Sequence, residues 1–172
     1  MAVIDGKIRT GRLVIRTMCE DDWRWNQEIW HDFNRSVYAP YDRELPEEDA
    51  AVQELTKKFS ESGLFFSVFL PDSGDMIGYI CFHQCGAEYD LGYCFHSAYQ
   101  GKGYALESAK AVIAYLTETR GAVHFTAATA LDNKPSCRLL DRLGFACAST
   151  ETVSFDGKFS FLGGNFIMTV PQ

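Results

Sequence analysis

Apolar residues recur at helical spacing through the segment that follows residue 103. Three further helices are indicated by their end signals: one after the acidic residues 20–22, one opened by Pro46, and a short one from Asn133 to Arg142 that stops at Gly144. The helical spacing itself is carried by Leu106, Ala109, Ile113 and Leu116, which lie three or four positions apart and share one helix face.

Apolar runs between these helices predict strands. The first five cover residues 11–16, 63–70, 76–83, 88–96 and 123–129, and two closing strands flank Phe155-Asp156-Gly157-Lys158, a hairpin signal. The predicted order is therefore β-α-α-β-β-β-α-β-α-β-β. This order favours an α/β (α+β) fold, in which a mixed sheet is covered by helices, over a doubly wound sheet with regular βα alternation.

The length of 172 residues suits one domain of ordinary size, and no repeat or linker divides the sequence. We therefore predict a single domain over residues 1–172. The sequence contains no run of about 18 apolar residues, and its first 16 residues lack the apolar core of a signal peptide. These features predict a cytoplasmic protein without membrane association.

The six cysteines do not form a metal-binding pattern. Cys81 and Cys85 lie four positions apart, but no second Cys or His pair has zinc-site spacing, so no metal is expected. Without a secretion signal the cysteines are interpreted as reduced thiols, mostly buried, because four of them lie in apolar or strand-like surroundings. These four are Cys81, Cys94, Cys137 and Cys147.

The formal net charge is −7. A general nucleic-acid binder is usually basic, so the charge argues against a nucleic-acid partner. An acidic surface suits solubility, and it also suits a cationic substrate.

The stretch from Tyr99 to Ala109 carries the main chemical signal, because two glycines directly precede a helix. A dinucleotide-binding fingerprint would need a third glycine where the chain has Leu106, and a P-loop would need Ser or Thr after Gly-Lys. What remains is an anion site on free N–H groups at a helix start, or a plain strand-to-helix turn. Spacing alone leaves both interpretations open.

Gln100-Gly101-Lys102-Gly103-Tyr104-Ala105 resembles the acyl-CoA pyrophosphate loop of the GNAT N-acetyltransferase superfamily, Q/R-x-x-G-x-G/A. Three other segments resemble the family in the expected order. They are the first strand, residues 11–16; the E-I-G-Y strand, here Asp90-Leu91-Gly92-Tyr93; and the N-x-x-S…LGF segment, here residues 133–145. The matches cover nearly the whole chain, which most resembles the branch containing the ribosomal-protein N-terminal (alanine) acetyltransferases.

The resemblance implies a GNAT fold: a mixed, mostly antiparallel sheet with a splayed central strand pair, flanked by helices. It implies acetyl-CoA as cosubstrate, with its pyrophosphate on the backbone amides of residues 101–105. Gln100 would cap the loop or bind the ligand. The strand near Tyr93, Phe95 and His96 would pair through its backbone with the pantetheine amides, and Asn133 would hydrogen-bond the pantetheine arm.

Acetyl transfer to an amine needs a proton acceptor, stabilisation of the carbonyl oxygen, and a way to handle the departing thiolate. Asp90 is the candidate base, with Glu88 in reserve and His96 as a further alternative. Ser136 is the candidate hydrogen-bond donor to the leaving sulfur. Leu140 stands where many family members carry a tyrosine acid, so that acid is excluded. Purely structural roles also stay open: Asp90 as a solvated carboxylate and Asn133 as a helix cap.

We therefore predict an N-acetyltransferase that works by direct attack in a ternary complex, with Cys94 and Cys137 as packing residues. The acceptor is a primary amine, with a protein or peptide N-terminus as the first choice and a small amine or amino-acid derivative as the second. The alternative is a non-catalytic acyl-CoA-binding sensor or interaction domain. Homodimer formation is left open. Side chains that could contribute to binding are Arg138 and Arg142 at the nucleotide 3′-phosphate, and the aromatic residues of segment 33–41 in the acceptor pocket.

Overall fold

The computed structural model describes residues 2–4, 6–154 and 159–171. Within this part of the chain the helices are α1 (Trp23–Asn34), α2 (Asp49–Ser62), α3 (Tyr104–Arg120) and α4 (Lys134–Leu143), with short 3-10 turns η1 (Glu20–Asp22), η2 (Ala39–Tyr41) and η3 (Ser97–Tyr99). The predicted helices are all present. The hairpin signal at residues 155–158 lies outside the described residues.

The strands form one sheet in the order β1-β2-β3-β4-β5-β6-β7-β9-β8. Their bounds are β1 (Ala2–Ile4), β2 (Lys7–Arg9), β3 (Val14–Thr17), β4 (Phe65–Phe69), β5 (Met76–Cys85), β6 (Glu88–Phe95), β7 (His124–Ala130), β8 (Ala146–Val153) and β9 (Phe161–Thr169). Strands β1 and β2 were not predicted. Each has three residues, too few to show an alternating pattern, and each is held by pairing with its neighbour.

The sheet is antiparallel except at β6 and β7, which run parallel. These two strands pair only from Glu88 to Asp90, opposite His124 to Thr126, whereas β6 stays paired with β5 as far as Phe95. Beyond Asp90 the edge of β6 that faces β7 therefore has no strand partner among the described residues. The mixed, helix-covered sheet and its splayed central pair are confirmed.

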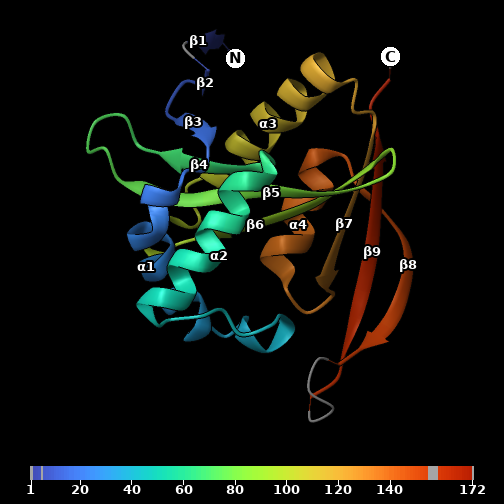
Figure 1. Ribbon diagram of the computed structural model, residues 1–172. Coiled ribbons are helices and arrows are strands. Elements are labelled where there is room, and N and C mark those ends of the chain that lie inside the picture. The colour runs from blue at the N-terminus through green and yellow to red at the C-terminus, as the bar shows by residue number, and fades with distance from the viewer. Residues whose placement is uncertain (1, 5, 155–158, 172) are drawn as a thin grey trace.

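Helices cover both faces of the sheet, as Figure 1 shows: α1 and α2 lie together, apart from α3 and α4. Phe66 and Ile80 belong to the core beneath α3, whereas Phe65 and Tyr79 pack with Ile29 and Trp30 of α1. Because both faces of β4 and β5 are covered, these strands read as continuous apolar runs.

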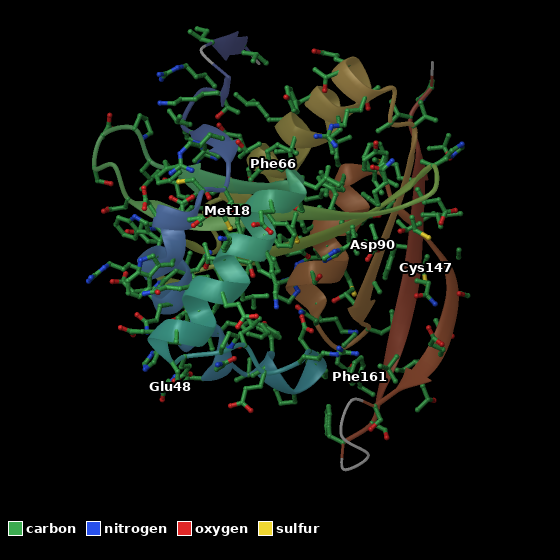
Figure 2. All side chains as sticks on the ribbon, viewed as in Figure 1. Met18, Glu48, Phe66, Asp90, Cys147 and Phe161 are labelled. Carbon is green, nitrogen blue, oxygen red and sulfur yellow. The ribbon has the colours of Figure 1, made fainter. Side chains whose placement is uncertain are left out.

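The thiols are reduced, but the expectation that they are mostly buried is wrong, because Cys19, Cys85 and Cys147 are exposed. Cys147 lies on the outer strand β8, as Figure 2 illustrates. Cys81 is buried, and Cys94 and Cys137 are half-buried. All residues of β8 from Ala146 to Thr152 are exposed, which the apolar neighbourhood of Cys147 in the sequence does not reveal.

None of the helices in the described part of the chain has the length and apolar character needed to span a bilayer.

Candidate functional site

A cavity of about 360 Å³ opens where β6 separates from β7, between the start of α3 and the start of α4. The loop before α3 contributes Gln100, Gly101 and Gly103, and β6 contributes its C-terminal half. The end of β6 and the loop before α3 therefore share one cavity with the start of α4, about 30 residues further along the chain, because the short parallel pairing lets the strands diverge there.

The backbone at the start of α3 presents a row of free N–H groups. Gly101 and Gly103 have φ values of +73° and +82°, a region that favours glycine, and α3 starts directly after them. Among the described residues, the N–H groups from Gly101 to Leu106 meet no hydrogen-bond acceptor, and the next one, of Glu107, donates to the Gly103 carbonyl at 3.1 Å. Such a row at a helix N-terminus is suited to an anion such as a pyrophosphate.

The structure adds a second reason for glycine at position 103. Glycine also lets the backbone approach an anion without a side chain in the way. Within the protein itself, a Cβ at Gly103 would meet Nη2 of Arg12 at 3.5 Å, an ordinary contact, and one at Gly101 would meet nothing within 4 Å. The positive φ therefore explains the two glycines more directly than lack of space does.

Gln100 secures the loop from the strand side. Its Nε2 donates to the carbonyl oxygen of Phe95 at 2.8 Å, and Phe95 lines the cavity. His96 and Lys102 are not among the lining residues. The His96 ring accepts a hydrogen bond from the Ala98 N–H at Nδ1, which makes it the cap of η3, and the Lys102 ammonium donates to the Ala98 carbonyl.

Asn133 and Ser136 meet at the start of α4. Oδ1 of Asn133 accepts the N–H of Ser136 at 3.2 Å, so Asn133 does cap the helix. Both residues line the cavity. Within the described residues Nδ2 of Asn133 has no acceptor, which leaves this amide free for a ligand.

Ser136 shares a hydrogen bond with the hydroxyl of Tyr93, which reaches it from β6. Burial raises the pKa of Tyr93 to about 12, against the opposing effect of this hydrogen bond, so the phenol stays protonated at neutral pH. Sequence reasoning considered only the backbone of Tyr93. The alternation of β6 could have shown that Tyr93 and Phe95 face the same side, but not that α4 brings Ser136 to meet them.

Cys94 also lines the cavity, on the opposite face of β6 from Tyr93. Burial raises the pKa of its thiol to about 12, helped by the charges of Asp32 and Asp42. A thiol that stays protonated at neutral pH is a poor nucleophile. The side chain therefore offers little for covalent acyl transfer.

The other end of the cavity is lined by Asp32, Phe33 and Tyr38, from the end of α1 and the segment after it. Oδ1 and Oδ2 of Asp32 accept the hydroxyl and the N–H of Ser97, both at 2.7 Å, so this carboxylate ties α1 to η3. Tyr41 packs against Phe161 of β9, with ring centroids 5.2 Å apart. Trp30 is fully buried. Of the aromatic residues of segment 33–41, Phe33 and Tyr38 line the cavity and Tyr41 does not.

The other residues predicted from the sequence differ in whether they line the cavity. Arg138 and Arg142 line the cavity from α4. Asp90 does not line it: the side chain is exposed, and Oδ1 accepts the hydroxyl of Thr126 at 3.0 Å, at the last paired position of β6 and β7. Leu140 is buried. In the described residues no group of three or more His, Cys, Asp or Glu side chains is placed to hold a metal ion.

The model of the acetyltransferase (GNAT) domain family matches residues 12–146. An uncharacterized N-acetyltransferase of Bacillus subtilis, YnaD, is 33% identical over 139 residues, which are 80% of this chain and 81% of the relative. The [ribosomal protein uS5]-alanine N-acetyltransferase of Escherichia coli is 29% identical over 155 residues, covering 81% of this chain and 77% of the relative.

Solved structures share the fold. A GNAT-family acetyltransferase from Bacillus anthracis aligns with a TM-score of 0.83 at 23% identity, over 95% of this chain and 98% of its own. The microcin C7 self-immunity acetyltransferase MccE, solved with acetyl-CoA and AMP, aligns with a TM-score of 0.83 at 11% identity, over 98% of both chains.

Proposed function

Since this chain belongs to the GNAT acetyltransferase family, whose members are acyl-CoA-dependent transferases, we propose that it acetylates the free α-amino group of a protein or peptide N-terminus. The observation that carries the proposal is the shared cavity, which joins the free amides before α3, the Tyr93–Ser136 pair and the aromatic end of α1. The relative that acts on ribosomal protein uS5 supports a protein N-terminus as the acceptor.

The amides of residues 101–106 would hold the pyrophosphate of acetyl-CoA, and the arginines of α4 would add positive charge for the nucleotide phosphates. The unpaired edge of β6 and the free amide of Asn133 would align the pantetheine arm. The thioester would then lie near Ser136, with Phe33 and Tyr38 beside the incoming amine. Acetyl-CoA supplies the activated acyl group, and the chain supplies its orientation.

Direct transfer fits this site better than a covalent intermediate, because the Cys94 thiol is protonated. An α-amino group has a pKa of about 8, so part of it is neutral at physiological pH and a modest base is enough. Asp90 is the proposed base. It lies outside the cavity lining, so it would act on the amine through water.

The proposal is tested with acetyl-CoA and a panel of peptides that differ only at the N-terminus, free or blocked. We expect release of CoA and addition of one acetyl group to peptides with a free α-amine. Acetylation of lysine side chains or small amines alone would contradict the assigned acceptor. Binding of acetyl-CoA without turnover on any amine would favour a non-catalytic acyl-CoA sensor.

Ser136→Ala is expected to lower kcat about tenfold, while the KM for acetyl-CoA changes less. An interaction with the leaving sulfur forms in the transition state, so its loss reduces kcat more than substrate binding. Tyr93→Phe removes the hydroxyl that shares a hydrogen bond with Ser136 and should have a smaller effect in the same direction. Cys137→Ala, next along α4 and outside the cavity lining, is the control. A kcat within twofold of wild type for Ser136→Ala would leave water as the acid.

Gly103→Val is expected to lower the affinity for acetyl-CoA at least tenfold. A branched residue does not adopt a φ of +82° without strain, so the loop would rearrange and its free amides would turn away from the ligand. Gly121→Val is the matched control: it sits at φ +63° beyond the other end of α3, in open space. Titration calorimetry should show a loss for the first variant only, and equal affinities would remove the loop from the binding site.

A further inference from the structure

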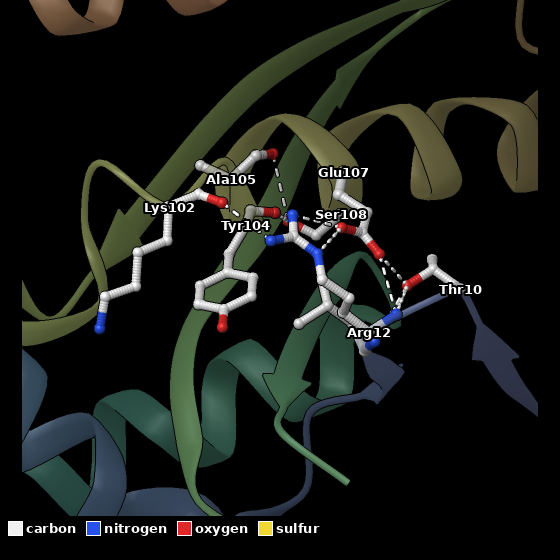
Figure 3. A network of polar contacts seen from close by, with 8 residues as sticks. Thr10, Arg12, Lys102, Tyr104, Ala105, Glu107 and Ser108 are labelled. Carbon is white, nitrogen blue, oxygen red and sulfur yellow. Dashed lines mark hydrogen bonds and ion pairs between the residues drawn. The ribbon is translucent and has the colours of Figure 1, made fainter.

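The turn between β2 and β3 reaches across to the first turn of α3, and Arg12 makes the central contacts (Figure 3). Its Nε donates to Oε2 of Glu107 at 2.8 Å, and its Nη2 lies 2.7 Å from the same oxygen. Its Nη1 donates to the Lys102 carbonyl at 3.0 Å, and its guanidinium lies 4.7 Å from the centre of the Tyr104 ring. One side chain therefore contacts two residues of the candidate pyrophosphate loop, Lys102 and Tyr104, and Glu107 in the first turn of α3.

The bond to the Lys102 carbonyl also orients the next amide. In a planar trans peptide the C=O and the following N–H point in opposite directions. Because the Lys102 carbonyl points to Arg12, the N–H of Gly103 points away from Arg12, and Gly103 lines the cavity. Arg12 thus fixes the direction of one of the free N–H groups that would bind the anion.

Arg12 also neutralises the negative charge of Glu107. Oε1 of Glu107 accepts hydrogen bonds from the Thr10 hydroxyl at 2.5 Å and from the backbone N–H of Arg12 at 3.1 Å. Burial alone would raise the pKa of Glu107, but the hydrogen bonds from Thr10 and Arg12 outweigh it and hold the pKa below its ordinary value. The side chain is therefore a carboxylate at neutral pH, in the helix turn that would receive a pyrophosphate. Without Arg12 its negative charge would repel that ligand.

We propose that Arg12 is a positioning residue for the acyl-CoA pyrophosphate, which it serves by fixing the Lys102–Gly103 peptide and by neutralising Glu107. This inference rests on the proposed role of residues 101–106 as the pyrophosphate site. Arg12 need not touch the ligand, because its side chain already binds the Lys102 carbonyl of the loop and the carboxylate of Glu107. Lysine at position 12 would keep the positive charge but lose the forked geometry with which the guanidinium contacts Glu107 and the Lys102 carbonyl at once.

The test compares acetyl-CoA with S-acetylpantetheine, a thioester donor without pyrophosphate, in wild type and four variants. Arg12→Gln should raise the Kd and KM for acetyl-CoA about tenfold, leave kcat at saturation within twofold, and leave kcat/KM for S-acetylpantetheine unchanged. Arg12→Lys should be intermediate. Arg12→Gln combined with Glu107→Gln should recover part of the affinity, because the unpaired carboxylate is gone.

Arg9→Gln is the control, since it removes the same charge from an exposed residue of β2. An Arg12→Gln variant that binds acetyl-CoA as wild type does, or that loses no more than Arg9→Gln, would overturn the proposal. So would an equal loss with both donors, which would indicate a general structural role. If wild type uses the two donors equally well, residues 101–106 do not bind pyrophosphate, and the site assignment fails rather than the role of Arg12 within it.

Discussion

Asp90→Asn is expected to lower kcat about 100-fold, the low end for loss of a general base. Asp90 lies on β6 where its pairing with β7 ends, and Thr126 donates to Oδ1. Within the part of the chain that the structure describes, Oδ2 accepts no hydrogen bond, so it can orient a water that takes the proton of the amine. Asparagine keeps the shape and removes the proton acceptor. The KM for acetyl-CoA should change little, because Asp90 is outside the cavity lining.

The pH dependence of kcat distinguishes a general base at Asp90 from a solvated carboxylate. If it is the base, the variant should recover activity at higher pH, where more of an amine with a pKa of about 8 is already neutral. Glu88→Gln is the matched control, a carboxylate two residues earlier on the same face of β6. An unchanged rate and profile for Asp90→Asn would show that Asp90 is a solvated strand residue, and the same test would then pass to Glu88 and His96. Unchanged rates for all three variants would indicate an amine that reacts without a protein base.

Asp22→Asn is expected to lower the free energy of unfolding by about 3 kcal/mol, as does breaking other buried ion pairs. The Asp22 carboxylate is 3% exposed and accepts bonds from Arg16 at 2.6 and 2.8 Å, from the Ser67 hydroxyl at 2.8 Å and from the Cys19 N–H at 3.0 Å. It joins the start of α1 to β3 and β4. Asparagine leaves the Arg16 charge without its partner in a half-buried place.

This pair should also set part of the acid stability. Burial alone would raise the pKa of Asp22, but the bonds from Arg16, Cys19 and Ser67 hold it below its ordinary value. A lowered native pKa stabilises the fold above the unfolded value of about 3.9, and this contribution is lost as the pH falls through the native value. Urea unfolding at pH 7 and pH 3 should therefore show a smaller difference between wild type and Asp22→Asn at pH 3.

Asp21→Asn, at the exposed neighbour in η1, is the matched control for this stability test. Its free energy of unfolding should stay within about 0.5 kcal/mol of wild type, as for most surface substitutions. An equal cost for both variants at pH 7 would contradict the role of the buried pair.

The sequence by itself determined the features that depend on local chemistry. The glycines at 101 and 103, followed by apolar residues at helical spacing, predicted the turn and α3, because positive φ and helix periodicity are properties of neighbouring residues. Asn133 capped the short helix as its side chain predicted. The ordered motifs were enough to indicate the family and its mixed sheet.

Only the tertiary structure decided which distant residues meet. Strands β1 and β2 exist because of pairing, Tyr93 reaches Ser136 across 43 positions, and Arg12 meets Glu107 across 95. Asp90 is on the predicted strand, yet its distance from the cavity follows from where β6 and β7 part. Periodicity tells which face of an element is buried, but the partner across that face depends on strand order, register and splay, which no local stretch of sequence encodes.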